Sequence, residues 1–272
     1  KAPDLRLYNK PYSVSITNSP HNIVLIIGES LNKDHMSLYG YPLKTTPKLD
    51  SLQNHNQLFV FDSIKSSATS TILAFKYIMT SLRSSDDPAE WLSKDFLLNI
   101  MNSAGYHTMW VSNQSKTGVH DNVVTRFAEL SDSMQFCGTR FMGPGKRDYD
   151  EVVLPYIQAR ANDTLFTPKF TIVHLMGSHE RFSVRYPAEY QHFSEGHYIN
   201  FPKNQRQTRS EYDNSILYND CIISDIIQYY QDKEAIIIYF PDHGLDIYHS
   251  DNNYAGHARQ AIPASYNAGT NI

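Results

Sequence analysis

Two apolar runs of the sequence are each followed at once by residues that can bind a metal ion. Glu29 comes directly after Asn22–Gly28 (NIVLIIG), and Asp242 and His243 come directly after Ala235–Pro241 (AIIIYFP). Nearly continuous apolar runs are typical of buried strands in a parallel sheet, and ligands bind beyond the carboxyl ends of such strands. Two carboxylates and an imidazole form a ligand set that suits zinc. The pattern therefore predicts a metal site at the carboxyl edge of a parallel sheet.

A cluster of hydroxyl side chains offers a nucleophile for such a metal. Residues 66–71 (SSATST) precede an apolar stretch that is predicted to be helical from Ile72 onward. A hydroxyl at a helix N-terminus lies among unpaired backbone N–H groups, which favour a phosphate there, and metal coordination lowers the pKa of the hydroxyl. The residues alone do not select one of the five hydroxyls, and a helix cap in a Ser/Thr-rich loop explains the cluster equally well.

A third apolar run ends beside another candidate residue. Lys169–Gly177 (KFTIVHLMG) is followed by Ser178 and His179, which we expect at the same edge of the sheet. His174 lies inside the run, and we interpret it as a core residue, because a histidine within a buried strand packs more often than it binds a ligand.

Strands and helices that alternate along the chain must position these residues, which predicts a doubly wound α/β fold, a three-layer α/β/α sandwich with a mainly parallel central sheet. The predicted strands are Asn22–Gly28, Leu58–Ile64, His107–Ser112, Lys169–Gly177 and Ala235–Pro241. The predicted helices are Thr46–His55, Ile72–Leu82, Ser93–Ala104, Asp148–Asn162 and Arg209–Gln231. The polar and aromatic segment Arg181–Gln207 has no periodicity and is expected to be a long loop near the site.

Composition narrows the class of protein. With 272 residues, 41% of them hydrophobic, residues 1–272 are expected to form a single domain with a substantial core. The balance of 24 basic and 28 acidic residues argues against a nucleic-acid partner. No apolar stretch approaches the roughly 20 residues that span a bilayer. The two cysteines, Cys137 and Cys221, predict a fold that does not depend on disulfides.

The segment 22–49, NIVLIIGESLNKDHMSLYGYPLKTTPKL, resembles the opening motif of the bacterial phosphoethanolamine transferases, which belong to the alkaline phosphatase and sulfatase superfamily. The resemblance continues in order through most of the chain, in segments 67–72 (SATSTI), 104–114 (AGYHTMWVSNQ), 172–187 (IVHLMGSHERFSVRYP), 211–220 (EYDNSILYND) and 236–248 (IIIYFPDHGLDIY). The chain is most similar to the subgroup that modifies heptose in the lipopolysaccharide core. The resemblance implies a fold like that of alkaline phosphatase and the sulfatases.

The resemblance also implies roles for individual residues. It implies one tight zinc site, with a second ion also expected in some relatives, and it selects Thr71 as both ligand and nucleophile. The implied zinc ligands are Glu29, Thr71, Asp242 and His243. His179 and His257 are implied to be catalytic residues that meet the phosphate, the acceptor or a second zinc. Asn113 and Gln114, at the end of a predicted strand, are implied to contact substrate.

The activity implied by the resemblance is transfer of phosphoethanolamine from phosphatidylethanolamine to a lipopolysaccharide sugar, a core heptose or lipid A, through an intermediate on Thr71. The family acts at the periplasmic face of the bacterial inner membrane and carries an N-terminal membrane domain, so residues 1–272 are expected to be the catalytic part of a longer protein. Two alternatives stay open. One is a phosphodiesterase or phosphatase of the same fold, and the other is a binding domain that has lost its metal.

Overall fold

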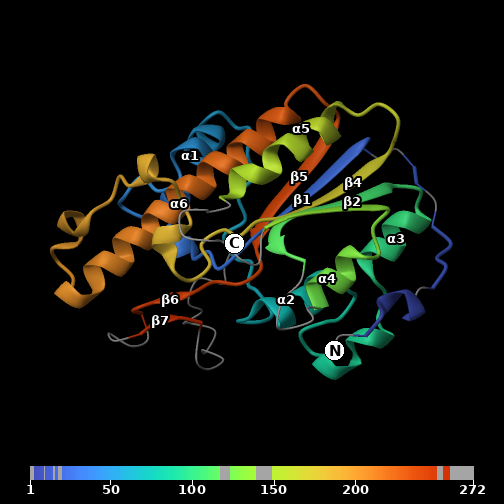
Figure 1. Cartoon of the computed structure of the whole chain (residues 1–272), viewed down its shortest axis with the longest axis horizontal. Coiled ribbons are helices and arrows are strands. Elements are labelled where there is room, and N and C mark those ends of the chain that lie inside the picture. The colour runs from blue at the N-terminus through green and yellow to red at the C-terminus, as the bar shows by residue number, and fades with distance from the viewer. Residues whose placement is uncertain are drawn as a thin grey trace.

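The centre of the molecule is a five-stranded parallel sheet with the strand order β3-β2-β4-β1-β5 (Figure 1). The computed structural model describes residues 3–8, 10–14, 16–17, 20–116, 123–138, 149–249 and 254–257. The strands of the main sheet are β1 (Asn22–Gly28), β2 (His107–Ser115), β3 (Ser133–Gly138), β4 (Lys169–His174) and β5 (Ala235–Pro241). A small antiparallel pair follows, formed by β6 (Asp246–Ile247) and β7 (Ala255–Gly256).

Helices cover both faces of this sheet (Figure 1). One face carries α1 (Pro47–Asn54), α5 (Leu154–Asn162) and α6 (Lys203–Tyr229). The other face carries α2 (Thr71–Ile78), α3 (Leu97–Ser103) and α4 (Val123–Ala128). Short 3-10 helices connect them: η1 (Leu5–Tyr8), η2 (Lys33–His35), η3 (Ser37–Tyr39), η4 (Pro88–Ser93), η5 (Asp150–Val153), η6 (Phe182–Val184), η7 (Ala188–Tyr190) and η8 (Glu195–Tyr198).

The sequence of β1 explains this three-layer packing. Val24 and Ile26 belong to the core under α1, α5 and α6, whereas Leu25 and Ile27 belong to the core under α2, α3 and α4. Successive side chains of a strand point to opposite faces, so a strand that is covered on both sides must be apolar at every position. The predicted α/β/α sandwich with a parallel sheet is therefore confirmed.

One predicted strand was wrong and one strand was missed. Leu58–Ile64 forms no strand, and it leaves Phe59 90% and Phe61 64% exposed. β3 takes a place in the sheet instead, at the edge opposite β5. Its sequence, SMQFCG, is half-buried and only weakly apolar because an edge strand has less surface to bury. Apolar character alone thus pointed to the wrong segment.

The long segment before α6 is largely irregular, as expected, with η6, η7 and η8 as single turns. α6 begins at Lys203, directly after Pro202, six residues earlier than the predicted start at Arg209. Within the described ranges, none of the helices combines the length and the hydropathy that a bilayer crossing demands.

Candidate metal centre

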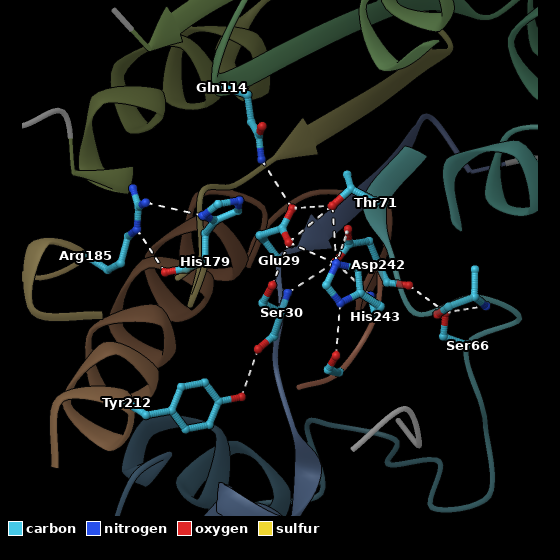
Figure 2. Close-up of polar contacts among 12 residues, drawn as sticks. Glu29, Ser30, Ser66, Thr71, Gln114, His179, Arg185, Tyr212, Asp242 and His243 are labelled. Carbon is cyan, nitrogen blue, oxygen red and sulfur yellow. Dashed lines mark hydrogen bonds and ion pairs between the residues drawn. The ribbon is translucent and has the colours of Figure 1, made fainter. Parts of the chain in front are cut away.

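β1 and β5 bring the three strand-end residues together. The two strands are parallel neighbours with Gly28 opposite Pro241, so Glu29 and Asp242 emerge side by side. Single ligand atoms of Glu29, Asp242 and His243 all lie within 4.8 Å of one another, and the three side chains are buried (Figure 2). The register of one strand pair therefore builds a three-residue cluster from segments that are more than 200 positions apart.

The loop after β4 presses against Glu29 from the other side. Ser178 donates its backbone N–H to the carbonyl oxygen of Glu29 at 3.0 Å. Gly177 has a φ of +53°, and a Cβ at this position would lie 2.8 Å from the backbone nitrogen of Glu29. A glycine is thus required for the two backbones to approach so closely. The loop after β4 therefore fixes the backbone of Glu29 on this side of the site.

α2 adds a hydroxyl to the cluster. Thr71 is the first residue of this helix, and its Oγ1 lies 3.1 Å from Oε2 of Glu29 and 3.3 Å from Nε2 of His243. Ser70, at the N-cap, makes no side-chain capping bond. Ser66 hydrogen-bonds the carbonyl oxygen of Asp242 at 2.7 Å and so supports the loop. Of the five hydroxyls in 66–71, the structure brings that of Thr71 to Glu29 and His243.

Burial and the contacts among Glu29, Asp242 and His243 shift the pKa of each of the three groups. Burial, together with the negative charge of Glu29, raises the pKa of Asp242 to about 8. Burial alone would lower the pKa of His243, but its hydrogen bond to Glu29 and the two carboxylates raise that pKa to about 9. Burial would raise the pKa of Glu29, yet the bond to His243 and the positive charge of its ring hold it below its usual range.

An unpaired oxygen points to what the cluster lacks. Among the described residues, Oδ2 of Asp242 is buried and accepts no hydrogen bond, and its ion-pair contact with Nε2 of His243 is long, at 3.5 Å. A buried carboxylate oxygen that accepts no hydrogen bond is costly, and a metal ion bound closer than this ring would offset the cost. Two carboxylates, one imidazole and a hydroxyl at these distances fit a divalent metal ion of the zinc type, with its preference for nitrogen and oxygen ligands.

Two further histidines border the cluster. His179 is half-buried, and its ring contributes to the lowered pKa of Glu29. Arg185 donates to the carbonyl oxygen of His179 at 3.0 Å and lies 3.4 Å from Nδ1 of the same histidine (Figure 2). The ring of His257 stands edge-on to that of His243, with centroids 4.7 Å apart. Burial, followed by the charge of His243, lowers the pKa of His257. The structure therefore places both histidines at the border of the centre.

The two candidate substrate residues of β2 point in different directions. Gln114 reaches Oε2 of Glu29 with its Nε2 at 3.4 Å, whereas Asn113 donates to Oδ1 of Asp150 at 2.9 Å. Asp150 in turn accepts the backbone N–H groups of Met176 and Gly177. The register between β2 and β3 shifts between Ser112 and Ser115, and the two neighbouring side chains turn to different partners here. Asn113 instead supports the loop that carries His179.

Sequence reasoning missed Ser30 and Arg185. Ser30 donates its hydroxyl to Oε1 of Glu29 at 2.7 Å and its N–H to Oδ1 of Asp242 at 3.2 Å. The position of Ser30 directly after a candidate ligand was a usable signal. Arg185 lies in the aperiodic segment after β4, where the sequence holds no pattern that marks it.

Together, a doubly wound parallel sheet and a buried carboxylate–imidazole cluster beside a helix-terminal threonine define an α/β protein with a group of residues that could hold a metal ion. The chain belongs to the sulfatase family, whose model matches residues 21–270. This family membership confirms the resemblance to the alkaline phosphatase and sulfatase superfamily.

Curated relatives are named phosphoethanolamine transferases, which agrees with the family that the sequence resembles. The chain is 33% identical over 238 residues to the phosphoethanolamine transferase EptC of Escherichia coli K12, and the match covers 85% of the chain and 41% of that protein. It is 34% identical over 238 residues to the phosphoethanolamine transferase CptA of Salmonella typhimurium, with the same coverage. The chain thus spans about two fifths of the length of these relatives.

Solved structures agree with the fold. The C-terminal periplasmic domain of E. coli EptC, solved in complex with Zn, matches with a TM-score of 0.80 at 31% identity, covering 89% of this chain and 69% of that one. The soluble domain of lipooligosaccharide phosphoethanolamine transferase A from Neisseria meningitidis matches with a TM-score of 0.72 at 20% identity, covering 94% and 75%. This second match bears on the fold alone.

Proposed function

We propose that residues 1–272 form the catalytic domain of a zinc-dependent phosphoethanolamine transferase. The observation that carries the proposal is the position of the Thr71 hydroxyl, 3.1 Å from Glu29 and 3.3 Å from His243 in a cluster that includes Asp242. Relatives at 33–34% identity are named phosphoethanolamine transferases, and a solved relative holds Zn. The names of the relatives support the transfer of phosphoethanolamine, and the Zn complex supports zinc as the metal.

Glu29, Thr71, Asp242 and His243 would hold one zinc ion tightly. When bound, zinc supplies a Lewis acid that lowers the pKa of the Thr71 hydroxyl and offsets the negative charge of a phosphate. Two carboxylates balance the charge of a dication, and Ser30 fixes the orientation of both through its N–H and hydroxyl. If the purified protein holds more than one zinc ion per chain, we assign the second ion to His179 and His257.

In the proposed reaction, Oγ1 of Thr71 forms a bond to the phosphorus of phosphatidylethanolamine while the bond from phosphorus to the diacylglycerol oxygen breaks, and the proton lost by the Thr71 hydroxyl ends on that oxygen, so that diacylglycerol leaves as a neutral alcohol. The phosphate, now on Thr71, lies at the N-terminus of α2, whose unpaired N–H groups favour its oxygens. A sugar hydroxyl of lipopolysaccharide then attacks, and the bond to Thr71 breaks. His179 or His257 accepts the proton of that hydroxyl.

We place the activity at the periplasmic face of the bacterial inner membrane, with a membrane domain outside residues 1–272. The solved E. coli EptC relative is named a periplasmic domain, and EptA of N. meningitidis is named an integral membrane protein. The acceptor is a core heptose or lipid A.

The test uses the full-length protein in vesicles that contain phosphatidylethanolamine with a fluorescent acyl chain, with and without purified lipopolysaccharide. The proposal expects fluorescent diacylglycerol and lipopolysaccharide that gains phosphoethanolamine in mass spectra. Release of free phosphoethanolamine at the same rate without acceptor would favour a hydrolase. A chain that takes up no zinc after dialysis against the metal would favour a binding domain.

A further inference from the structure

The residue after Glu29 has an unusual backbone conformation. Ser30 is buried and has a φ of +59°, which is the left-handed region. For a residue with a Cβ this conformation is unfavourable and persists only where the surroundings hold it. The strain lies directly beside a proposed ligand, and this raises the question of which group maintains it.

A single hydroxyl from α6 holds the backbone on both sides of this turn. The hydroxyl of Tyr212 donates to the carbonyl oxygen of Ser30 at 2.8 Å and accepts the N–H of Asn32 at 2.8 Å (Figure 2 shows the bond to Ser30). Tyr212 is fully buried. Its phenol therefore uses both its donor and its acceptor on a segment that lies 182 positions earlier in the chain.

The ring of Tyr212 is itself fixed. It packs edge-on against His35, with centroids 5.1 Å apart, and against Phe182, with centroids 4.9 Å apart. Asp213, the next residue of α6, hydrogen-bonds Nδ1 of His35 at 2.6 Å and the hydroxyl of Tyr41 at 2.8 Å. The hydroxyl thus has a rigid support that does not involve the metal centre.

The conformation of Ser30 determines how two proposed ligands lie. Its hydroxyl donates to Oε1 of Glu29, and its N–H donates to Oδ1 of Asp242. Because φ is the rotation about the N–Cα bond, an extended Ser30 would change how its N–H and its hydroxyl lie relative to each other, and the two would no longer reach Asp242 and Glu29 together. We propose that Tyr212 is a positioning residue of the metal centre: its hydroxyl holds Ser30 left-handed before any ion binds, and Ser30 then orients Glu29 and Asp242. This inference rests on the proposed zinc function.

The first variant removes only the hydroxyl. Tyr212→Phe leaves a buried carbonyl and a buried N–H without their partner, and zinc affinity should fall roughly tenfold. Competition with a chromophoric chelator measures this affinity without an activity assay. The matched control is Tyr218→Phe, which removes another buried hydroxyl of α6, one that bonds Glu151. Tyr218→Phe should lower stability and leave zinc affinity unchanged.

A second pair of variants tests the left-handed turn itself. Ser30→Gly and Ser30→Ala both remove the serine hydroxyl, but glycine adopts a positive φ freely and alanine does not. With Tyr212 present the turn is already formed, and the two variants should bind zinc alike. In the Tyr212→Phe background, Ser30→Gly should bind zinc about threefold more tightly than Ser30→Ala, because only alanine must then be forced into the turn.

The outcomes separate this inference from the proposed function. A wild-type chain that binds no zinc contradicts the function. A wild-type chain that binds zinc, with Tyr212→Phe equal to it, overturns the positioning role and leaves the function standing. Equal zinc affinities of Ser30→Gly and Ser30→Ala in the Tyr212→Phe background would also overturn the positioning role of Tyr212.

Hydrogen exchange of the wild-type chain covers the case in which Tyr212→Phe does not fold. The N–H of Asn32, the donor to Tyr212, should exchange slowly even without zinc, because the turn exists before the ion binds. Fast exchange of this one amide in the zinc-free protein, with slow exchange after zinc is added, would overturn the inference.

Discussion

Two buried polar clusters of the described residues include the two ends of the segment 29–35. One is the candidate metal centre of Glu29, Asp242 and His243, and the other is the pair His35 and Asp213. Both consist of carboxylates and imidazoles that are almost fully buried. By residue type and burial alone, each qualifies as a functional site.

Their hydrogen bonds distinguish them. Asp213 bonds Nδ1 of His35 with one oxygen and accepts the hydroxyls of Tyr41 and Tyr198 with the other. Asp242, by contrast, has a buried oxygen without a hydrogen bond and a pKa raised to about 8. A complete set of hydrogen bonds indicates a structural role, whereas a buried carboxylate oxygen that accepts no hydrogen bond is the feature expected of a metal-binding group. The hydrogen bonds, not burial, distinguish the candidate site.

The largest expected effect separates the nucleophile from its neighbours. Thr71→Ala should reduce transfer by at least about 10³-fold, because it removes the atom that forms the new bond to phosphorus. Ser67→Ala, an exposed hydroxyl of the same loop, is the matched control and should keep wild-type turnover. Release of diacylglycerol by the full-length protein measures both. Normal turnover in Thr71→Ala would refute the assignment of the nucleophile.

A pair of isosteric changes tests the comparison directly. Asp213→Asn removes one charge from a satisfied buried pair and should cost about 3 kcal/mol of unfolding free energy in urea. Asp242→Asn should lower zinc affinity at least about 100-fold yet leave the zinc-free chain about as stable as wild type, since Asp242 already holds a proton in that chain and asparagine is likewise uncharged. If Asp242→Asn destabilises the zinc-free chain as much as Asp213→Asn does, the two clusters do not differ as described.

The raised pKa of Asp242 predicts how zinc affinity and the stability of the zinc-free chain change with pH. Because the folded, zinc-free chain holds a proton on this group up to about pH 8, zinc binding at pH 7 should release it, and zinc affinity should rise with pH. The same raised pKa lowers the stability of the zinc-free chain as pH rises from about 4 to 8, since the folded state binds more protons than the unfolded one.

Calorimetry in two buffers of different ionisation enthalpy counts the released protons. Asp242→Asn should release fewer of them than wild type. Zinc binding that takes up protons at pH 7, or an affinity that falls between pH 6 and pH 8, would contradict the assigned charge state.

The smallest expected effect concerns the two neighbours in β2. Gln114→Ala removes a contact to Glu29 and should lower zinc affinity a few-fold, with little change in stability. Asn113→Ala removes the bond to Asp150 and should cost about 1–2 kcal/mol of stability, with zinc affinity unchanged. Chelator competition and urea unfolding of both variants check this, and a reversed pattern would mean that Asn113 is the residue facing the centre.

The sequence predicted those parts of the site that follow from which residues are neighbours along the chain. Glu29, Asp242 and His243 stood out because polar residues directly followed apolar runs, and parallel strands bring such residues to one edge. Thr71 could be chosen only through the resemblance, since five hydroxyls share its loop. The contact between Ser30 and Tyr212 left no trace in sequence because it joins residues 182 positions apart by a single hydroxyl. Burial decided between Leu58–Ile64 and β3, and burial is a property of the assembled sheet.

The place of β5 has a consequence for the solubility of the chain. In the described part of the chain, β5 is an outer strand, and Ile236 and Ile238 are 48% and 46% exposed on it. An apolar edge strand is a template on which other chains can pair and precipitate. Ile236→Lys places a charge near the amino end of β5, far along the strand from Asp242, so it should keep concentrated protein in solution while the centre retains its affinity for zinc.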